Sequence, residues 1–213
     1  MFITFEGIEG SGKSLQIARA REHLERKGFE CLLTREPGGT AFGAALRKVL
    51  LDTDGCRREP RCELLLYLAD RYQHLREVIR PALDRGMVVL CDRYQDATRA
   101  YQGAARGIDA GEIEKLVELL GIIEPDKTIL FDLDPEEGLA RARRRNTIDP
   151  VSASEGRFEA EGLSFHRRVR AAYLGLADRW PDRIQIVPAS ASPDEIFVHV
   201  AGLLDAWLPI SRR

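Results

Sequence analysis

The strongest constraint on the fold is a glycine-rich segment near the start of the chain, Gly7-Ile8-Glu9-Gly10-Ser11-Gly12-Lys13-Ser14. It matches the phosphate-binding loop pattern G-x-x-x-x-G-K-[ST], whose glycines let successive backbone N–H groups point at a polyphosphate. Lys13 supplies a positive charge for the β- and γ-phosphates, and the Ser14 hydroxyl can bind Mg²⁺. A strand-like run precedes the segment and a helical pattern follows it. We therefore predict a nucleoside triphosphate site here, in preference to a glycine turn with an exposed lysine.

Apolar strand-like runs alternate with helical patterns along the rest of the chain. The expected strands are Met1–Glu6, Phe29–Thr34, Met87–Cys91, Thr128–Asp132 and Arg183–Val187. The expected helices are Ser14–Lys27, Phe42–Leu50, Arg61–Leu83, Ala110–Leu120, Pro135–Arg145, Phe158–Arg179 and Pro193–Leu208. Continuous apolar strands that alternate with helices are typical of a parallel sheet covered on both faces. The sequence therefore predicts a three-layer α/β/α fold of the P-loop NTPase type around a five-stranded parallel sheet.

Composition limits the classes of partner. A chain of 213 residues with 44% hydrophobic content suits a single α/β domain, residues 1–213. The formal net charge of -2 argues against a dedicated nucleic-acid binder. No apolar run approaches the length that spans a membrane, and the first residues resemble a strand and not a signal peptide. We therefore expect a cytoplasmic protein with neither nucleic acid nor membrane as a partner.

Charged side chains follow two of the expected strands. Arg35 begins the glycine-rich string Arg35-Glu36-Pro37-Gly38-Gly39-Thr40, and Asp92-Arg93-Tyr94 follows the strand that ends at Cys91. Ligands of parallel α/β sheets collect at the carboxyl ends of the strands. Asp92 can hold Mg²⁺ and Arg93 can clamp phosphate oxygens. The alternatives are a solvated arginine in a turn for Arg35 and a structural ion pair for Asp92 and Arg93.

The segment from Asn146 to Gly156 lacks apolar periodicity and is expected to form an exposed loop. It follows an arginine-rich helix end, Arg141-Ala142-Arg143-Arg144-Arg145. Cations at a helix C-terminus are favourable in themselves, so one interpretation is an ordinary surface loop after a solvated helix end. The other is a mobile lid at about residues 144–157, from which one or two arginines reach a transferring phosphoryl group.

The order of these motifs resembles that of thymidylate kinases over nearly the whole chain. The resemblance rests on the glycine loop preceded by Phe5-Glu6, the string Arg35–Thr40, Asp92-Arg93-Tyr94, Tyr101-Gln102-Gly103 and the segment Glu159–His166. It implies a nucleoside-monophosphate-kinase-like domain that transfers the γ-phosphoryl group of ATP to dTMP, with Mg²⁺ as cofactor and a homodimer as the assembly. The Arg35–Thr40 string combined with the Asp92–Gly103 segment is far more specific than the phosphate loop alone.

The resemblance also implies roles for single residues. For the acceptor these are Glu9 at the sugar 3′-hydroxyl, Arg35 and Arg93 at the phosphate, Tyr67 stacked on thymine, Arg71 at a thymine carbonyl, Thr98 near the thymine N3 edge, Tyr101 beside the deoxyribose and Gln102 nearby. Two positions depart from the family pattern. Tyr67 stands where phenylalanine is usual, and Gly156 stands where aspartate is frequent.

The source of the catalytic arginines follows from the same resemblance. Gly10 stands where some members have arginine, and members with glycine there resemble a bacterial subtype that supplies its catalytic arginines from the lid. Besides Lys13 and Arg93, the expected catalytic residues are therefore Arg141 and Arg143, with Arg145 ranked after them. Ser14 and Asp92 are the expected metal ligands.

The motifs leave two alternative functions. One is a P-loop kinase for another nucleotide or nucleoside. The other is a regulatory protein that binds a nucleoside triphosphate without transferring phosphate. The second is disfavoured because the strand Thr128–Asp132 lacks the D-x-x-G continuation of a GTPase switch: Asp132 is followed by Leu133-Asp134-Pro135.

Overall fold

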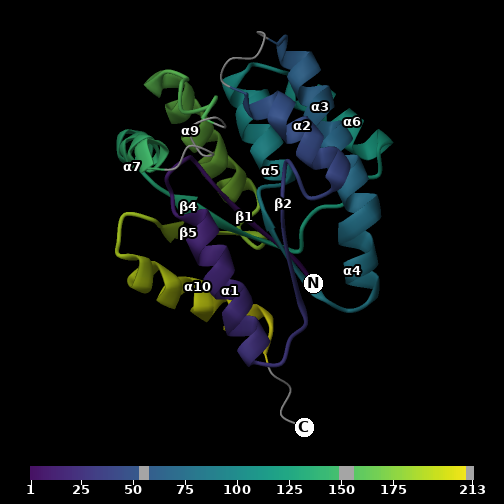
Figure 1. Ribbon diagram of the computed structural model, residues 1–213, viewed down its shortest axis with the longest axis vertical. Helices are drawn as coiled ribbons and strands as arrows, with labels where there is room; N and C mark the ends of the chain where they lie inside the picture. Colours follow the sequence, from purple (N-terminus) through teal and green to yellow (C-terminus); the bar gives the residue numbers. More distant parts are fainter. Residues whose placement is uncertain (53–57, 149–155, 210–213) are drawn as a thin grey trace.

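The computed structural model describes residues 1–52, 58–148 and 156–209 (Figure 1). Five parallel strands form a sheet in the order β2-β3-β1-β4-β5. Their bounds are Phe2–Gly7 for β1, Cys31–Arg35 for β2, Val88–Asp92 for β3, Lys127–Asp132 for β4 and Ile184–Pro188 for β5. The predicted five-stranded parallel sheet is confirmed, and each strand begins and ends within two residues of its expected bounds.

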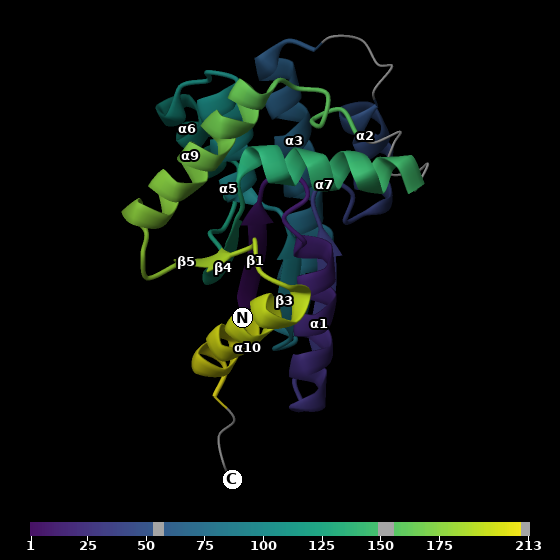
Figure 2. The same cartoon turned by 90° about the vertical axis from the view of Figure 1, so that its left-hand side faces the viewer.

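Helices cover both faces of the sheet and complete the three layers (Figure 2). Helices α1 (Lys13–Arg26) and α10 (Pro193–Trp207) pack on one face. The other face carries α4 (Arg80–Asp84), α5 (Gln95–Thr98) and α9 (Leu163–Arg179). The remaining helical segments are α2 (Ala41–Leu51), α3 (Pro60–His74), η1 (Leu75–Ile79), η2 (Arg99–Ala105), α6 (Ala110–Leu119) and α7 (Pro135–Ile148). Of the helices that are described, none is long and apolar enough to cross a membrane.

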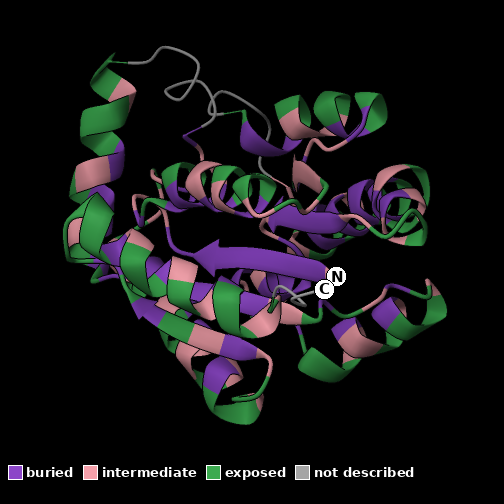
Figure 3. Ribbon diagram, turned by 90° about the horizontal axis from the view of Figure 1, so that it is seen from below, coloured by how far each residue is buried: buried purple, intermediate pink, exposed green. Residues whose placement is uncertain are grey.

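Alternating side chains of the strands build a core on each face of the sheet. Ile3 and Phe5 belong to the cluster that includes α1 and α10. Phe2 and Val89 belong to the cluster that includes α3, η1 and α4. Figure 3 shows the central strands buried while the helices turn exposed faces outward. Neighbouring side chains of β3 therefore belong to different clusters, as the period of two in a strand requires.

The carboxyl ends of the central strands lie together at one edge of the sheet. Arg35 of β2 and Phe5 of β1 both pair in register with Asp92 of β3. Gly7, the last residue of β1, pairs with Phe131 of β4. Because the strands are parallel, the glycine loop, Arg35 and Asp92 meet at this edge, where ligands of such sheets bind.

The long helix that follows α2 contains one π-helical turn next to Pro81. The predicted helix Arg61–Leu83 is one continuous helical run in three parts, α3, η1 and α4, in which η1 is π-helical. Pro81 cannot donate a backbone hydrogen bond, and its ring clashes with the preceding turn of a regular α-helix. The N–H of Arg80 bonds to the carbonyl of Leu75, five residues back. The extra residue in this turn accommodates Pro81 without ending the helix.

Three helical expectations need correction. Helix α7 extends to Ile148, so Asn146 to Ile148 are helical and not loop. The helix expected from Phe158 begins at Leu163, because a turn in which the Glu161 N–H bonds to the Phe158 carbonyl precedes it. The segment Gln95–Ala105 is helical although no helix was predicted there. Half of the expected lid, residues 149–155, lies outside the described residues.

Truncation of a buried strand residue tests this packing. Leu90 of β3 is completely buried, and we expect Leu90→Ala to lower the free energy of unfolding by about 2–5 kcal/mol because it leaves a cavity between the sheet and α1. The matched control is Val198→Ala on α10, where the side chain is 71% exposed and the change should stay within about 0.5 kcal/mol. Urea unfolding measures both. Equal losses in the two variants would contradict the assignment of Leu90 to the core.

Candidate active site

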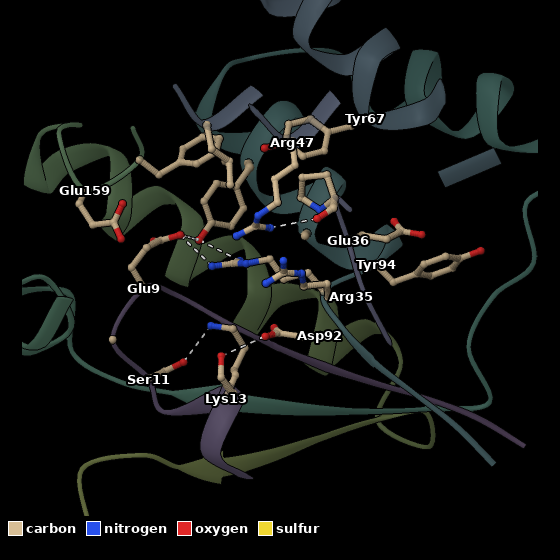
Figure 4. A pocket seen from close by; sticks show the side chains of 18 of the residues that line it. Glu9, Ser11, Lys13, Arg35, Glu36, Arg47, Tyr67, Asp92, Tyr94 and Glu159 are labelled. Carbon is tan, nitrogen blue, oxygen red and sulfur yellow. Dashed lines mark hydrogen bonds and ion pairs between the residues drawn. The ribbon is translucent and has the colours of Figure 1, made fainter. Parts of the chain in front are cut away.

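A cavity of about 620 Å³ opens at the carboxyl edge of the sheet (Figure 4). Its described lining brings together most of the predicted site residues: Glu9, Gly10, Ser11, Gly12, Lys13, Ser14, Arg35, Tyr67, Arg71, Asp92, Arg93, Thr98, Tyr101, Gln102 and Arg141. Three predicted residues are not among the described residues of the lining, namely Gly7, Ile8 and Arg143. Gly7 and Ile8 are buried beneath the loop and contribute backbone to it.

The glycine loop is shaped by backbone that glycine adopts readily. Gly10 and Gly12 have φ of 73° and 85°, and helix α1 begins directly after Gly12. The Lys13 ammonium folds back over the loop and donates to the carbonyls of Gly7 at 2.9 Å and Ile8 at 2.8 Å. The loop and the N-terminus of α1 therefore present N–H groups and one ammonium at the same point, which is the arrangement that binds phosphate.

The Lys13 ammonium is less stable as a cation here than in water. Burial and the nearby Arg93 guanidinium lower the pKa of Lys13 to about 8, while the Asp92 and Glu9 carboxylates oppose that shift. A phosphate group bound beside Lys13 favours the charged form. The free protein thus holds a cation that gains stability when an anion arrives.

Helix α7 lies directly against the glycine loop. A Cβ atom added at Gly10 would lie 2.1 Å from the carbonyl oxygen of Gly138, and one added at Gly138 would lie 2.6 Å from the carbonyl oxygen of Glu9. Both distances are far below any tolerated contact, so backbone meets backbone at this crossing. The loop therefore cannot carry an arginine at position 10 while α7 keeps this place.

Ser14 and Asp92 form a pair suited to a hard cation. The Ser14 hydroxyl donates to Asp92 Oδ2 at 3.2 Å, at the mouth of the loop. Among the described residues, no group of three His, Cys, Asp or Glu side chains is placed to hold a metal ion. A hydroxyl and one carboxylate fit Mg²⁺, which usually completes its shell with water and substrate phosphates.

Glu9, which lies above Lys13 in Figure 4, forms a cluster with Arg93 and Tyr101. Glu9 Oε1 accepts from Arg93 Nη2 at 2.8 Å and from the Tyr101 hydroxyl at 2.7 Å. The Arg93 guanidinium lies 5.0 Å from the centre of the Tyr101 ring, and the backbone of Arg93 has a φ of 66°. Burial alone would raise the pKa of Glu9, but Arg93, His166 and Lys13 hold it well below its usual range. Glu9 is therefore ionised in the free protein.

Arg71 is fixed in the floor of the cavity. Its side chain is 2% exposed. Its Nε donates to Glu36 Oε2 at 2.7 Å, and its Nη1 donates to Gln95 at 2.7 Å and to Thr98 at 2.8 Å. Glu36 is in turn bonded to His74 Nδ1 at 2.9 Å. These contacts hold the guanidinium in one orientation before any ligand binds.

Tyr67 and Gln102 line the wall beside Arg71. Tyr67 lies one helical turn before Arg71 on α3, so the two share a face. Burial raises the pKa of the Tyr67 hydroxyl, which therefore stays protonated. Gln102 Nε2 donates to the buried Glu63 carboxylate at 2.8 Å. The wall thus combines an aromatic face with a fixed amide.

Two of the four arginines of helix α7 face the cavity, and the other two are not among the described residues of its lining. Arg141 and Arg145 both line it, as expected of residues four positions apart on a helix. Arg143 lies on a different face of α7, is exposed, and is not part of the described lining. Arg145 pairs with Glu159 at 2.8 Å. Of the two arginines expected to be catalytic, Arg141 therefore lies at the cavity and Arg143 does not, while Arg145, ranked after them, does.

Several lining residues carried no signal strong enough to single them out. These are Glu36, Arg47 and Phe158. Glu36 adjoins Arg35 in the glycine-rich string. A string of charged residues, proline and glycines is typical of an exposed loop, so it does not indicate that Glu36 is buried beside Arg71. Arg47 lies on α2 and donates to the Pro37 carbonyl at 2.9 Å. An arginine on an amphipathic helix gives no indication in sequence that it faces a cavity.

Comparison with known proteins identifies the family. A family model described as Thymidylate kinase matches residues 5–200. The chain belongs to the thymidylate kinase family. It is 53% identical to a thymidylate kinase of Nitratidesulfovibrio vulgaris strain Miyazaki F, over 94% of each chain. It is 50% identical to that of Solidesulfovibrio magneticus, over 98% of this chain and all of the relative.

Solved structures agree. A crystal structure of thymidylate kinase from Ehrlichia chaffeensis is 30% identical and superimposes with a TM-score of 0.76, covering 96% of this chain and 98% of the other. The predicted resemblance to thymidylate kinases, the α/β fold class and the assignment as a phosphotransferase of the nucleoside monophosphate kinase class are confirmed.

The lowered pKa of Lys13 predicts a pH dependence of nucleotide binding. The pKa is about 8 in the free protein and must rise when phosphate binds, so binding takes up a proton above that pH. Below pH 8 the titration of Lys13 should leave the affinity for a nucleoside triphosphate unchanged. Above pH 8 the affinity should fall by up to about tenfold per pH unit. Calorimetric titrations from about pH 7 to about pH 10 measure the slope. Lys13→Arg, which stays charged, should remove it; a flat wild-type profile would contradict the lowered pKa.

Proposed function

We propose that this enzyme transfers the γ-phosphoryl group of ATP to dTMP and releases ADP and dTDP. The observation that carries the proposal is the cavity itself. It joins a phosphate-binding loop at one end to a wall of Tyr67, Arg71 and Gln102 at the other. The first end suits a triphosphate and the second suits a flat base with fixed hydrogen-bonding groups. Membership of the thymidylate kinase family supports the choice of acceptor.

Catalysis in this proposal rests on positioning and on neutralising charge. The attacking oxygen of a nucleoside monophosphate is already anionic at neutral pH, so no strong general base is needed. The donor and acceptor phosphates repel each other. Lys13, Arg35 and Arg93 reach the cavity from the loop and from the ends of β2 and β3. Their charges offset the repulsion along the line of transfer.

Mg²⁺ is part of the proposal. Ser14 and Asp92 would hold it, together with phosphate oxygens of ATP, and its charge would neutralise those oxygens. The Ser14 hydroxyl and the Asp92 carboxylate already lie together at 3.2 Å. Their fit to a hard cation supports this assignment.

The acceptor side of the cavity is assigned as follows. Tyr67 stacks on the base, while Arg71 and Thr98, which are hydrogen-bonded to each other at 2.8 Å, face its polar edge. Tyr101 and Glu9 contact the sugar. A contact that recognises one methyl group discriminates by about 10–200-fold, so selection of thymine over uracil is expected to be modest.

Assembly and location complete the proposal. Helices α2 and α3 pack against each other and expose apolar side chains, among them Phe42 on α2 and Leu65 on α3. Exposed apolar side chains grouped on adjoining helices favour an interface between protein chains. We place the homodimer contact on these helices and the enzyme in the cytoplasm, where both substrates are available.

A panel of acceptors tests the reaction. With ATP and Mg²⁺, we expect turnover to be highest with dTMP among dTMP, dUMP, thymidine, CMP and AMP, measured by a coupled assay for ADP. Lys13→Ala should lower kcat by at least about 10³-fold while its unfolding transition stays cooperative, because it removes the cation at the β- and γ-phosphates. Faster turnover with another acceptor would identify a different kinase. ADP release that needs no acceptor would favour a regulatory ATPase.

The arrangement of α7 makes a second prediction. We expect Arg145→Ala to lower kcat by at least about 10²-fold with a much smaller change in the KM for dTMP, because the side chain reaches the transferring group and not the acceptor. Arg143→Ala is the matched control on the outward face and should stay within about twofold of the wild type. Steady-state kinetics with ATP saturating separate kcat from KM. The reverse pattern, with Arg143→Ala the impaired variant, would return the catalytic role to Arg143.

A further inference from the structure

The Glu9 carboxylate has an inner oxygen that faces a histidine. Oε1 points toward Arg93 and Tyr101, but Oε2 points toward helix α9 and lies 3.3 Å from His166 Nδ1. Both atoms are buried, and among the described residues neither makes another hydrogen bond. The Glu9 side chain is 9% exposed and the His166 side chain 1%. Two polar atoms are thus enclosed together beside the glycine loop.

The other nitrogen of the ring fixes where one proton lies. His166 Nε2 is 2.9 Å from the carbonyl oxygen of Phe158. A carbonyl oxygen only accepts, so Nε2 carries a proton and donates it. If the ring were neutral, Nδ1 would then direct a lone pair at the ionised Glu9 carboxylate. A proton on Nδ1 turns this repulsion into a charge-assisted interaction.

We propose that His166 is a positioning residue for Glu9, and that it acts as an imidazolium that ties the carboxylate of the glycine loop to the Phe158 carbonyl. The ring thereby connects the loop to the segment that follows residue 155. It also gives Glu9 a second cationic partner besides Arg93. When the Arg93 guanidinium turns to a phosphate oxygen, Glu9 keeps its place and its charge because His166 and Tyr101 remain bound to it.

The charged groups around the pair are compatible with this state. Arg93 and Lys13 add positive charge near Glu9, and Glu159 adds negative charge. Tyr101 stays protonated because burial raises the pKa of its hydroxyl. The Glu9 carboxylate is the anion in contact with the ring, so an imidazolium at this place has a charged partner.

Nuclear magnetic resonance tests the protonation state without any substrate. Long-range ¹H–¹⁵N spectra report whether each ring nitrogen carries a proton, and the chain has only His23, His74, His166 and His199 to assign. At pH 7 we expect both nitrogens of His166 to be protonated in the wild type. In Glu9→Gln the amide can donate to Nδ1, so the ring should become the neutral Nε2–H form. A neutral ring in the wild type would overturn the proposal.

Binding of dTMP tests the positioning role, and this part rests on the proposed function. We expect His166→Phe to raise the Kd for dTMP by about tenfold, because a charge-assisted contact to Glu9 is lost. The Kd for ATP should stay within about twofold. His166→Gln, whose amide can still donate to Glu9, should recover part of the loss. The control is His199→Phe on α10, where the histidine is exposed.

The outcomes separate the two proposals. Wild-type protein that binds no dTMP would contradict the proposed acceptor, while the spectra would still decide the state of His166. A folded His166→Phe that binds dTMP as tightly as the wild type would overturn the positioning role. Equal losses for dTMP and ATP in both His166 variants, with a lowered unfolding temperature, would assign His166 to the structure of α9 alone and would also overturn it.

Discussion

Positive charge held out of water at one edge of the sheet is the constraint on which the rest of this structure depends. Lys13, Arg71 and Arg93 are each largely buried before any anion is present. Isolated buried cations are costly, so each has partners supplied by the fold. Lys13 donates hydrogen bonds to backbone carbonyls of the loop, Arg71 to Glu36, and Arg93 to Glu9. The sheet, with its parallel strand ends, brings these groups from distant parts of the sequence to one place.

The partners also explain why the site is ready for its ligands. A guanidinium with four fixed contacts, such as Arg71, loses little freedom when it binds a base. Arg93 differs, because its guanidinium makes fewer hydrogen bonds, one to Glu9 and one to the Tyr101 hydroxyl. The fold therefore combines a guanidinium at Arg71 that is fixed on several sides with one at Arg93 that is held by Glu9 and Tyr101 alone among the hydrogen-bond partners of the described residues.

Much of this arrangement could be predicted from sequence, for identifiable reasons. The glycine loop and the five apolar strands are local signals, and the parallel sheet converts them into a site. The sequence did not predict the helical segment Gln95–Ala105 because polar residues such as Gln95, Asp96 and Gln102 occupy half of its buried positions and interrupt any apolar stripe. Those side chains are buried because they bond to Arg71, Arg183 and Glu63, far away in sequence.

The choice among the arginines of α7 shows the same limit. The same residue type occupies positions 141, 143 and 145 of this helix. Only the rotation of the helix against the loop decides which of these arginines face the cavity. That rotation is set by the crossing at Gly138, a contact that no local pattern reveals. The arginine-rich motif indicated the end of this helix as a segment near the site, but the direction of each arginine side chain depends on tertiary packing.

The crossing of Gly10 and Gly138 restricts how this enzyme can change over evolutionary time. The two backbones are in direct contact, so a side chain at either position would have to displace α7. A descendant that carried its catalytic cation on the loop would have to relocate α7 in the same step. With α7 in its present place, both positions are thus restricted to glycine.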